Sequence, residues 1–219
     1  MNEYSFSILI FASLFLRKGV LTLKKKGIKH QKIIDAAVKV IAHNGYHQAQ
    51  VAKIAREAGV ADGTIYLYFK NKEDILISVF HEKMGLFIKK IKEKIEEKQT
   101  AKEKLLLLIS LHFSQLQDNY DLALLTQLEL RQTNKELRMK INTVLHPYLK
   151  LIDDILEEGI QQKLFVPDLN VKVARQMIFG TIDEIVTNWV IKDFKYNLTE
   201  LAEPVLQLLL NGFCHKQTS

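Results

Sequence analysis

The chain has 219 residues, of which 47% are hydrophobic and 26% are charged, a balance that excludes gross disorder and leaves room for two domains. Only 9 Gly and 3 Pro interrupt it, which favours helices over the turn-rich sheets of all-β folds. The net charge of +6 resides in residues 1–74, with 12 Lys and Arg against 6 Asp and Glu, so this part suits a polyanionic partner and the neutral remainder does not.

Residues 1–27 begin with an apolar run, Ser5 to Leu16, that is shorter than the ~20 residues needed to span a bilayer. The run also makes a poor signal peptide, because Glu3 and no Lys or Arg precede it and no small-residue cleavage site follows. We predict that residues 1–27 are a non-native or mis-assigned extension, translated from too early a start. Peptides from residues 1–16 in the native host would contradict this prediction.

The remaining sequence predicts an all-α protein of nine helices in two domains, a DNA-binding domain at 28–74 and a ligand-binding and dimerisation domain at 75–219. Apolar residues recur at helical spacing, and Gly45 and Gly59 suit left-handed positions after helices. Asn71 predicts an N-cap, and Thr100 with Glu103 predicts a capping box. The expected helices are 29–42, 51–58, 62–69, 72–98, 101–117, 121–132, 135–163 bent at Pro147, 171–192 and 198–213.

Residues 45–76 (GYHQAQVAKIAREAGVADGTIYLYFKNKEDIL) predict a helix-turn-helix, two short helices joined by a tight turn at Gly59. Its second helix begins with small residues, which let the backbone approach the major groove. We expect phosphate or base contacts from the polar side chains and first-turn backbone of this motif. Asp62 is expected to cap the helix, and Tyr66 has packing as its alternative role. The candidate DNA-binding residues are Gln50, Ala61, Asp62, Gly63, Thr64, Tyr66, Tyr68 and Lys72.

The stretch IAREAGVADGTIYLYFKNKEDIL resembles the signature of the TetR family of repressors. The resemblance is close over residues 29–76 and implies an all-helical homodimer that pairs through its last two helices and binds double-stranded operator DNA. Two departures affect the expected contacts. Ala49 and Gln50 stand where the family often has two threonines, and Ala61 stands where it has the serine that precedes the recognition helix.

The C-terminal domain is neutral and rich in large apolar residues, enough to bury a core and leave a ligand cavity. Arginines on apolar helices need an acidic partner or an anionic ligand, and Asp183 or Glu184 is the expected partner of Arg175. His112 and His146 lack neighbours at metal-ligand spacing, so no metal site is predicted. The candidate ligand-binding residues are Phe113, Leu116, Leu124, Leu128, Arg131, Arg138, Arg175, Phe179 and Trp189, although core packing is the alternative for each apolar one.

The segments TQLELRQTNKELR and ARQMIFGTIDEIVTNWV resemble the branch of the TetR family that controls fatty-acid degradation in spore-forming bacteria. This resemblance implies a repressor of β-oxidation genes that a long-chain acyl-CoA releases from DNA. The alternative is a repressor of a multidrug efflux operon that responds to hydrophobic drugs. No catalytic motif is present, so we expect neither an enzyme nor a cofactor. Cys214 is the only cysteine, which suits a reducing cytoplasm, and no membrane partner is expected.

Overall fold

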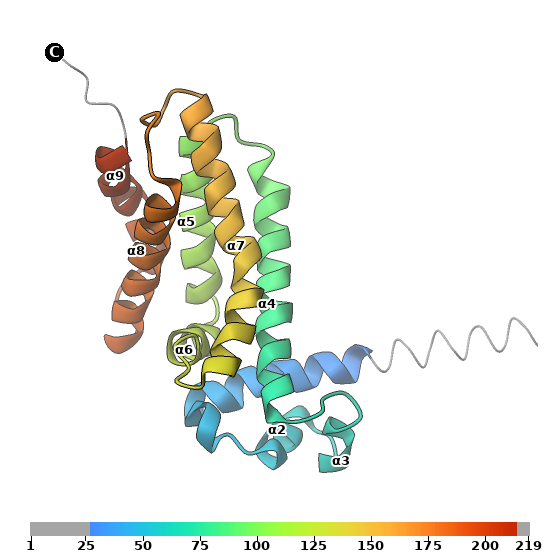
Figure 1. The fold of residues 1–219 in the computed structure, drawn as a ribbon. Helices are drawn as coiled ribbons and strands as arrows, with labels where there is room; N and C mark the ends of the chain where they lie inside the picture. The colour runs from blue at the N-terminus through green and yellow to red at the C-terminus, as the bar shows by residue number, and fades with distance from the viewer. Residues whose placement is uncertain (1–26, 214–219) are drawn as a thin grey trace, which may run out of the picture.

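The computed structural model describes residues 27–213, and all regular secondary structure in that part of the chain is helical (Figure 1). The predicted all-α, nine-helix architecture is confirmed. No helix between residues 27 and 213 is both long and apolar enough to cross a membrane. The predicted N-terminal extension lies outside the described residues, except for Gly27, which begins the first helix.

The first helix covers residues 27–48. The elements that follow are α2 (Val51–Ala58), α3 (Asp62–Ile65), α4 (Lys72–Ile95), α5 (Ala101–Gln117), α6 (Tyr120–Glu129), α7 (Lys135–Gln161), α8 (Val171–Ile191), the 3-10 helix η1 (Leu198–Leu201) and α9 (Ala202–Phe213).

Residues 27–71, which we call the head, pack the first helix, α2 and α3 around a small core. Ile33, Ile54 and Ile65 are fully buried in it, because each lies on the inner stripe of its helix. Gly59 ends α2 in the left-handed region, with φ of 66°, and turns the chain into α3 as predicted. Gly45 is also left-handed, with φ of 71°, but helical bonding resumes after it and carries the first helix beyond its predicted end.

The predicted N-caps at Asn71 and Thr100 are confirmed. The Asn71 side chain accepts a hydrogen bond from the Asp74 N–H at the start of α4, and Thr100 with Glu103 forms the complete capping box of α5. The third and the last predicted helices also differ from prediction. α3 is only four residues long and continues as turns to Phe69, and the last predicted helix divides into η1 and α9. Pro204 lacks an N–H and so fits the first turn of α9.

Residues 72–213 form a bundle, in which α4, α5 and α7 lie side by side while α8 and α9 pack on one flank (Figure 1). Helix α6 is short and lies at the end of the bundle that faces the head (Figure 1). The core is continuous and consists of leucine, isoleucine and aromatic side chains. Pro147 lies inside α7 as expected.

Polar contacts between side chains of the bundle and the first helix connect the head to the bundle. The Tyr46 N–H donates to Oε1 of Glu129 on α6 at 2.7 Å, and Glu129 is only 5% exposed. His43 Nε2 lies 3.0 Å from Oδ1 of Asp121, also on α6. In α4, Lys83 Nζ lies 2.6 Å from Oδ1 of Asp35 on the first helix. Helix α6 and the middle of α4 are therefore the elements that hold the head in place.

Candidate functional site

The exposed face of the head contains an open hollow between α2, α3 and the start of α4. It is lined by His47, Ala49, Gln50, Val51, Ala52, Asp62, Tyr66 and Lys72. Four of the eight candidate DNA-binding residues, Gln50, Asp62, Tyr66 and Lys72, therefore lie around one depression. Tyr66 is 59% exposed, which favours a contact with a partner over its alternative packing role.

Lys72 is held in place before any partner binds. Its Nζ donates to the His47 carbonyl oxygen at 2.9 Å and lies 4.7 Å from the centre of the Tyr46 ring. The ammonium is therefore positioned by a carbonyl and an aromatic face, neither of which neutralises its charge. It keeps a positive charge beside the hollow at the N-terminus of α4, where the helix dipole adds to it.

The beginning of α3 differs from the expected capping arrangement. Ala61 is the N-cap and makes no side-chain hydrogen bond, so the predicted cap at Asp62 is wrong. Asp62 is instead the first residue of the helix, where its charge complements the helix dipole. Ala61, Asp62 and Gly63 are exposed and Thr64 is half-buried, so the start of α3 is open to a large partner.

Two other positions of the motif are less accessible. Tyr68 is half-buried and packs against the His30 ring, with the ring centres 5.8 Å apart. Ala49 stands where the TetR family often has a threonine, and it is only 1% exposed. A threonine hydroxyl at this position would therefore lie in the head core. Gln50 is exposed beside it and is the N-cap of α2, with no side-chain capping bond.

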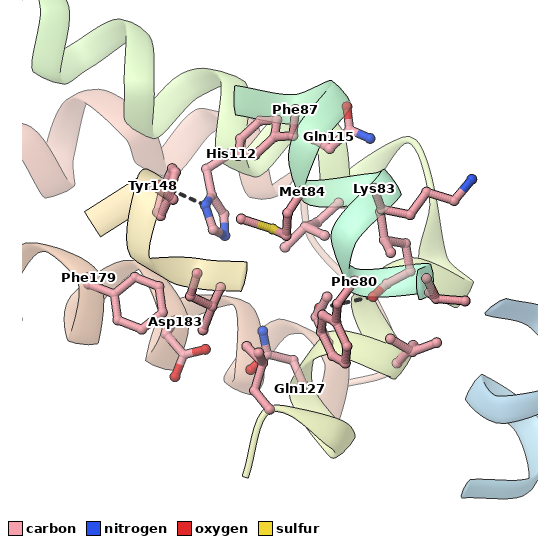
Figure 2. A pocket seen from close by; sticks show the side chains of 17 residues that line it. Phe80, Lys83, Met84, Phe87, His112, Gln115, Gln127, Tyr148, Phe179 and Asp183 are labelled. Atoms are coloured by element: carbon pink, nitrogen blue, oxygen red, sulfur yellow. Dashed lines mark hydrogen bonds between the residues drawn. The ribbon is translucent and has the colours of Figure 1, made fainter. Parts of the chain in front are cut away.

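The bundle contains an apolar cavity formed by α4, α5, α6, α7 and α8 (Figure 2). Most of the wall is aliphatic and aromatic. The lining residues are Val79, Phe80, Lys83, Met84, Phe87, His112, Gln115, Leu116, Leu122, Leu125, Thr126, Gln127, Leu130, Leu145, Tyr148, Phe179 and Asp183.

Of the candidate ligand-binding residues, Leu116 and Phe179 line this cavity and the other apolar candidates do not. Phe113 is fully buried on another side of α5, and Leu128 is 53% exposed on α6. Leu124 is partly buried against the core. Trp189 is buried near the end of α8, where its Nε1–H donates to the Tyr196 carbonyl at 2.8 Å and its ring lies against Tyr120 and Phe194.

The three candidate arginines bond to the protein itself. Arg175 pairs with Asp153 of α7 at 2.6 Å, so the predicted pairing with Asp183 or Glu184 is wrong. Asp183 is instead the partner of Arg131, at 2.5 Å. Arg138 donates to the Gln132 and Thr133 carbonyls at the start of α7. Arg131 is therefore bonded to a residue of the cavity wall, Asp183, whereas Arg175 and Arg138 do not line the cavity.

A polar pair on the cavity wall, the half-buried His112 and the fully buried Tyr148, was not predicted. His112 of α5 and Tyr148 of α7 are joined by a hydrogen bond of 2.9 Å between Nδ1 and the phenolic oxygen. Burial lowers the pKa of His112 to about 4 and raises the pKa of Tyr148 above its usual range. The sequence signal was present, because His112 lies four residues from both Leu108 and Leu116 on the apolar stripe of α5.

No cluster of three or more His, Cys, Asp or Glu side chains within residues 27–213 is arranged to hold a metal ion. The site thus consists of a hollow on the head, with the Lys72 ammonium at its edge, and an apolar cavity in the bundle. Helix α6 contacts both parts, since it lines the cavity and bonds to Tyr46.

Comparison with known proteins identifies the family of this chain. Residues 33–79 match the family model described as bacterial regulatory proteins, tetR family, and residues 80–212 match the model described as the C-terminal region of YsiA-like protein. The chain is 62% identical over 194 residues to the fatty acid metabolism regulator protein of Bacillus subtilis (strain 168). The aligned residues cover 89% of this chain and 100% of that protein.

Two solved structures have the same fold. The transcriptional regulator FadR from Bacillus subtilis, in complex with stearoyl-CoA, is 64% identical with a TM-score of 0.82, over 83% of this chain and 98% of that one. The fatty acid degradation regulator FadR from Bacillus halodurans is 60% identical with a TM-score of 0.81, over the same shares of the two chains. These relatives are transcriptional regulators and not enzymes. The chain therefore belongs to the TetR family of bacterial transcriptional regulators.

Proposed function

We propose that this regulator represses genes of fatty-acid degradation and that a long-chain acyl-CoA, bound in the bundle cavity, releases it from operator DNA. The observation that carries the proposal is the apolar cavity at the centre of a bundle whose FadR relative was solved with stearoyl-CoA. An acyl chain is the kind of ligand that a wall of aliphatic and aromatic side chains favours. The protein would act in the cytoplasm, where operator DNA is found.

The head is the proposed DNA-binding domain and the bundle the proposed ligand-binding and dimerisation domain. TetR regulators are dimeric, and two heads must lie ~34–36 Å apart to enter successive major grooves. The last two helices offer a surface for the second copy. Their exposed apolar side chains are Val173, Met177 and Ile191 on α8 and Leu208 on α9.

Ligand and DNA would be coupled through helices that contact both. Leu122 and Leu125 of α6 line the cavity, while Glu129 of the same helix holds the head through Tyr46. A ligand that displaces α6 and α4 changes the angle of the head and with it the spacing of the two heads. Release follows only if the ligand binds the DNA-incompetent arrangement more tightly.

A band shift on DNA upstream of the fatty-acid degradation operon tests the proposal. We expect a complex that stearoyl-CoA dissolves, while free stearate or CoA alone at the same concentration leaves it intact. A complex that ignores acyl-CoA but responds to hydrophobic drugs would replace the proposal with an efflux repressor. The pairing of Asp183 with Arg131 disfavours that outcome, because it leaves no free carboxylate for a cationic drug.

The DNA contacts can be tested separately at Tyr66, whose hydroxyl lies on the exposed face of the head. Removing one hydrogen bond to a phosphate in Tyr66→Phe should weaken operator binding by about three- to tenfold. Tyr196→Phe, a change far along the chain in the loop before η1, is the matched control and should bind normally. Equal affinity for all three proteins would remove Tyr66 from the interface.

A further inference from the structure

The cavity wall contains a polar pair, His112 and Tyr148, whose hydrogen-bonding capacity is not exhausted by the protein. Three other polar liners bond elsewhere: the Asp183 carboxylate to Arg131, the Lys83 ammonium to Asp35, and the Thr126 hydroxyl to backbone carbonyls of its own helix. The side-chain oxygen of Gln127 accepts from Thr187, which leaves the N–H group of its amide as a second donor on the wall. His112 bonds to Tyr148 through Nδ1 alone. Its second ring nitrogen, Nε2, faces the interior of the cavity (Figure 2).

The position of the ring proton follows from Tyr148. This residue is fully buried, and within residues 27–213 its hydroxyl bonds to His112 and to no other group. Since a buried hydroxyl proton needs an acceptor, the Tyr148 O–H donates to Nδ1. The imidazole hydrogen is therefore on Nε2, and an N–H donor points into a space whose walls are mostly apolar.

The charge of this donor is also determined by its surroundings. Burial lowers the pKa of His112 to about 4, so the ring is neutral at physiological pH. A single neutral N–H suits an uncharged oxygen acceptor. A carboxylate at the same depth would be a buried charge with no cation to balance it, because Lys83 and Arg131 are already paired with acids.

We propose that the Nε2–H of His112 donates a hydrogen bond to the thioester carbonyl of the bound acyl-CoA and that Tyr148 is the positioning residue that keeps the hydrogen on Nε2. This inference rests on the proposed acyl-CoA effector and adds the group that recognises it. His112 would select a neutral acyl thioester over the free acid without any contact to the CoA portion.

A pair of ligands that differ only at the carbonyl tests the assignment. S-octadecyl-CoA is a thioether that has a CH₂ group where stearoyl-CoA has its carbonyl. Titration calorimetry on the dimer should show the thioether binding about three- to tenfold more weakly, the effect of one neutral hydrogen bond. His112→Phe should bind both ligands equally, because the donor is gone and the ring volume is kept.

Two variants separate this role from packing. Met84→Leu changes another cavity wall residue without altering a polar group, so it should keep the preference for the thioester. Tyr148→Phe frees the hydrogen to move to Nδ1, so it should reduce the ratio of the affinity for stearoyl-CoA to the affinity for the thioether. If His112→Phe fails to fold, the Nε2–H proton resonance of the wild type should move downfield with stearoyl-CoA and not with the thioether.

Equal affinity of the wild type for the two ligands would overturn the assignment while leaving the acyl-CoA effector intact. A preference that survives in His112→Phe would also overturn it and would indicate the Gln127 amide, which lines the same cavity. If neither ligand binds, the proposed effector fails, and the inference fails with it.

Discussion

Glu129 offers a direct test of how the head is attached to the bundle. Its carboxylate accepts the Tyr46 N–H at 2.7 Å and also bonds to the Gln132 amide, and Glu129 and Gln132 are each 5% exposed. Glu129→Leu leaves both donors without an acceptor, at about 1–3 kcal/mol for each unsatisfied group. Part of this cost is offset by the apolar leucine, so we expect a loss of about 2–4 kcal/mol in the free energy of unfolding.

Urea denaturation at a fixed protomer concentration measures this loss. Glu129→Gln is the matched control, because its amide oxygen can still accept the Tyr46 N–H, and it should lose about 1 kcal/mol. The leucine variant should also show a smaller difference in operator affinity with and without stearoyl-CoA. A leucine variant as stable as the wild type, or a glutamine variant as damaged as the leucine one, would refute the reasoning.

Three further expectations concern other parts of the chain. Burial lowers the pKa of His112 from 6.5 to about 4, so the unfolded chain binds the proton at a higher pH than the folded chain does. The free energy of unfolding should therefore fall by about 3 kcal/mol as the pH drops from 6.5 to 4. Unfolding curves measured over a pH series should show this fall in the wild type and not in His112→Phe. Gly159→Ala should cost about 1–3 kcal/mol in thermal unfolding, because the new methyl group would collide with the buried Phe165 ring, whereas Gly85→Ala has open space and should be neutral or slightly stabilising. Lys72→Ala should weaken operator binding and lower the slope of log affinity against log salt concentration by about one; an unchanged slope would show that its ammonium does not meet a phosphate.

Local signals predicted the helix boundaries that depend on neighbouring residues. Asn71 and Thr100 act on backbone N–H groups within one turn, so their caps could be read from four consecutive residues. The end of α3 was predicted less well. Ile65 and Phe69 face the head core at helical spacing, yet the chain between them follows turns, because tertiary packing and not periodicity determines its path.

The cavity shows why candidate ligand residues were harder to predict. On α5, His112, Gln115 and Leu116 share the stripe that lines it, while Phe113 is rotated about 100° from His112 and packs in the core instead. Hydrophobicity does not distinguish these two faces, since Phe113 on one and Leu116 on the other are both buried. Only the placement of four other helices determines which face borders the cavity.

The predicted ion-pair partner of Arg175 was wrong for a related reason. A partner for Arg175 was sought on its own helix, at Asp183 or Glu184, but the chain brings Asp153 of the antiparallel α7 beside it. The same applies to the bond between His112 and Tyr148, which are 36 residues apart. Contacts between helices depend on how the helices pack, and the spacing of residues along a single helix does not reveal this packing.

The environment of Trp189 also makes the protein its own optical probe. It is the only tryptophan in the sequence, it is 1% exposed, and its ring contacts Tyr120 at the start of α6 and Phe194 after α8. Helices α6 and α8 are two of the five that line the cavity. The wavelength and quenching of tryptophan emission should therefore follow any separation of these helices, so effector occupancy can be monitored in unlabelled protein, on and off DNA.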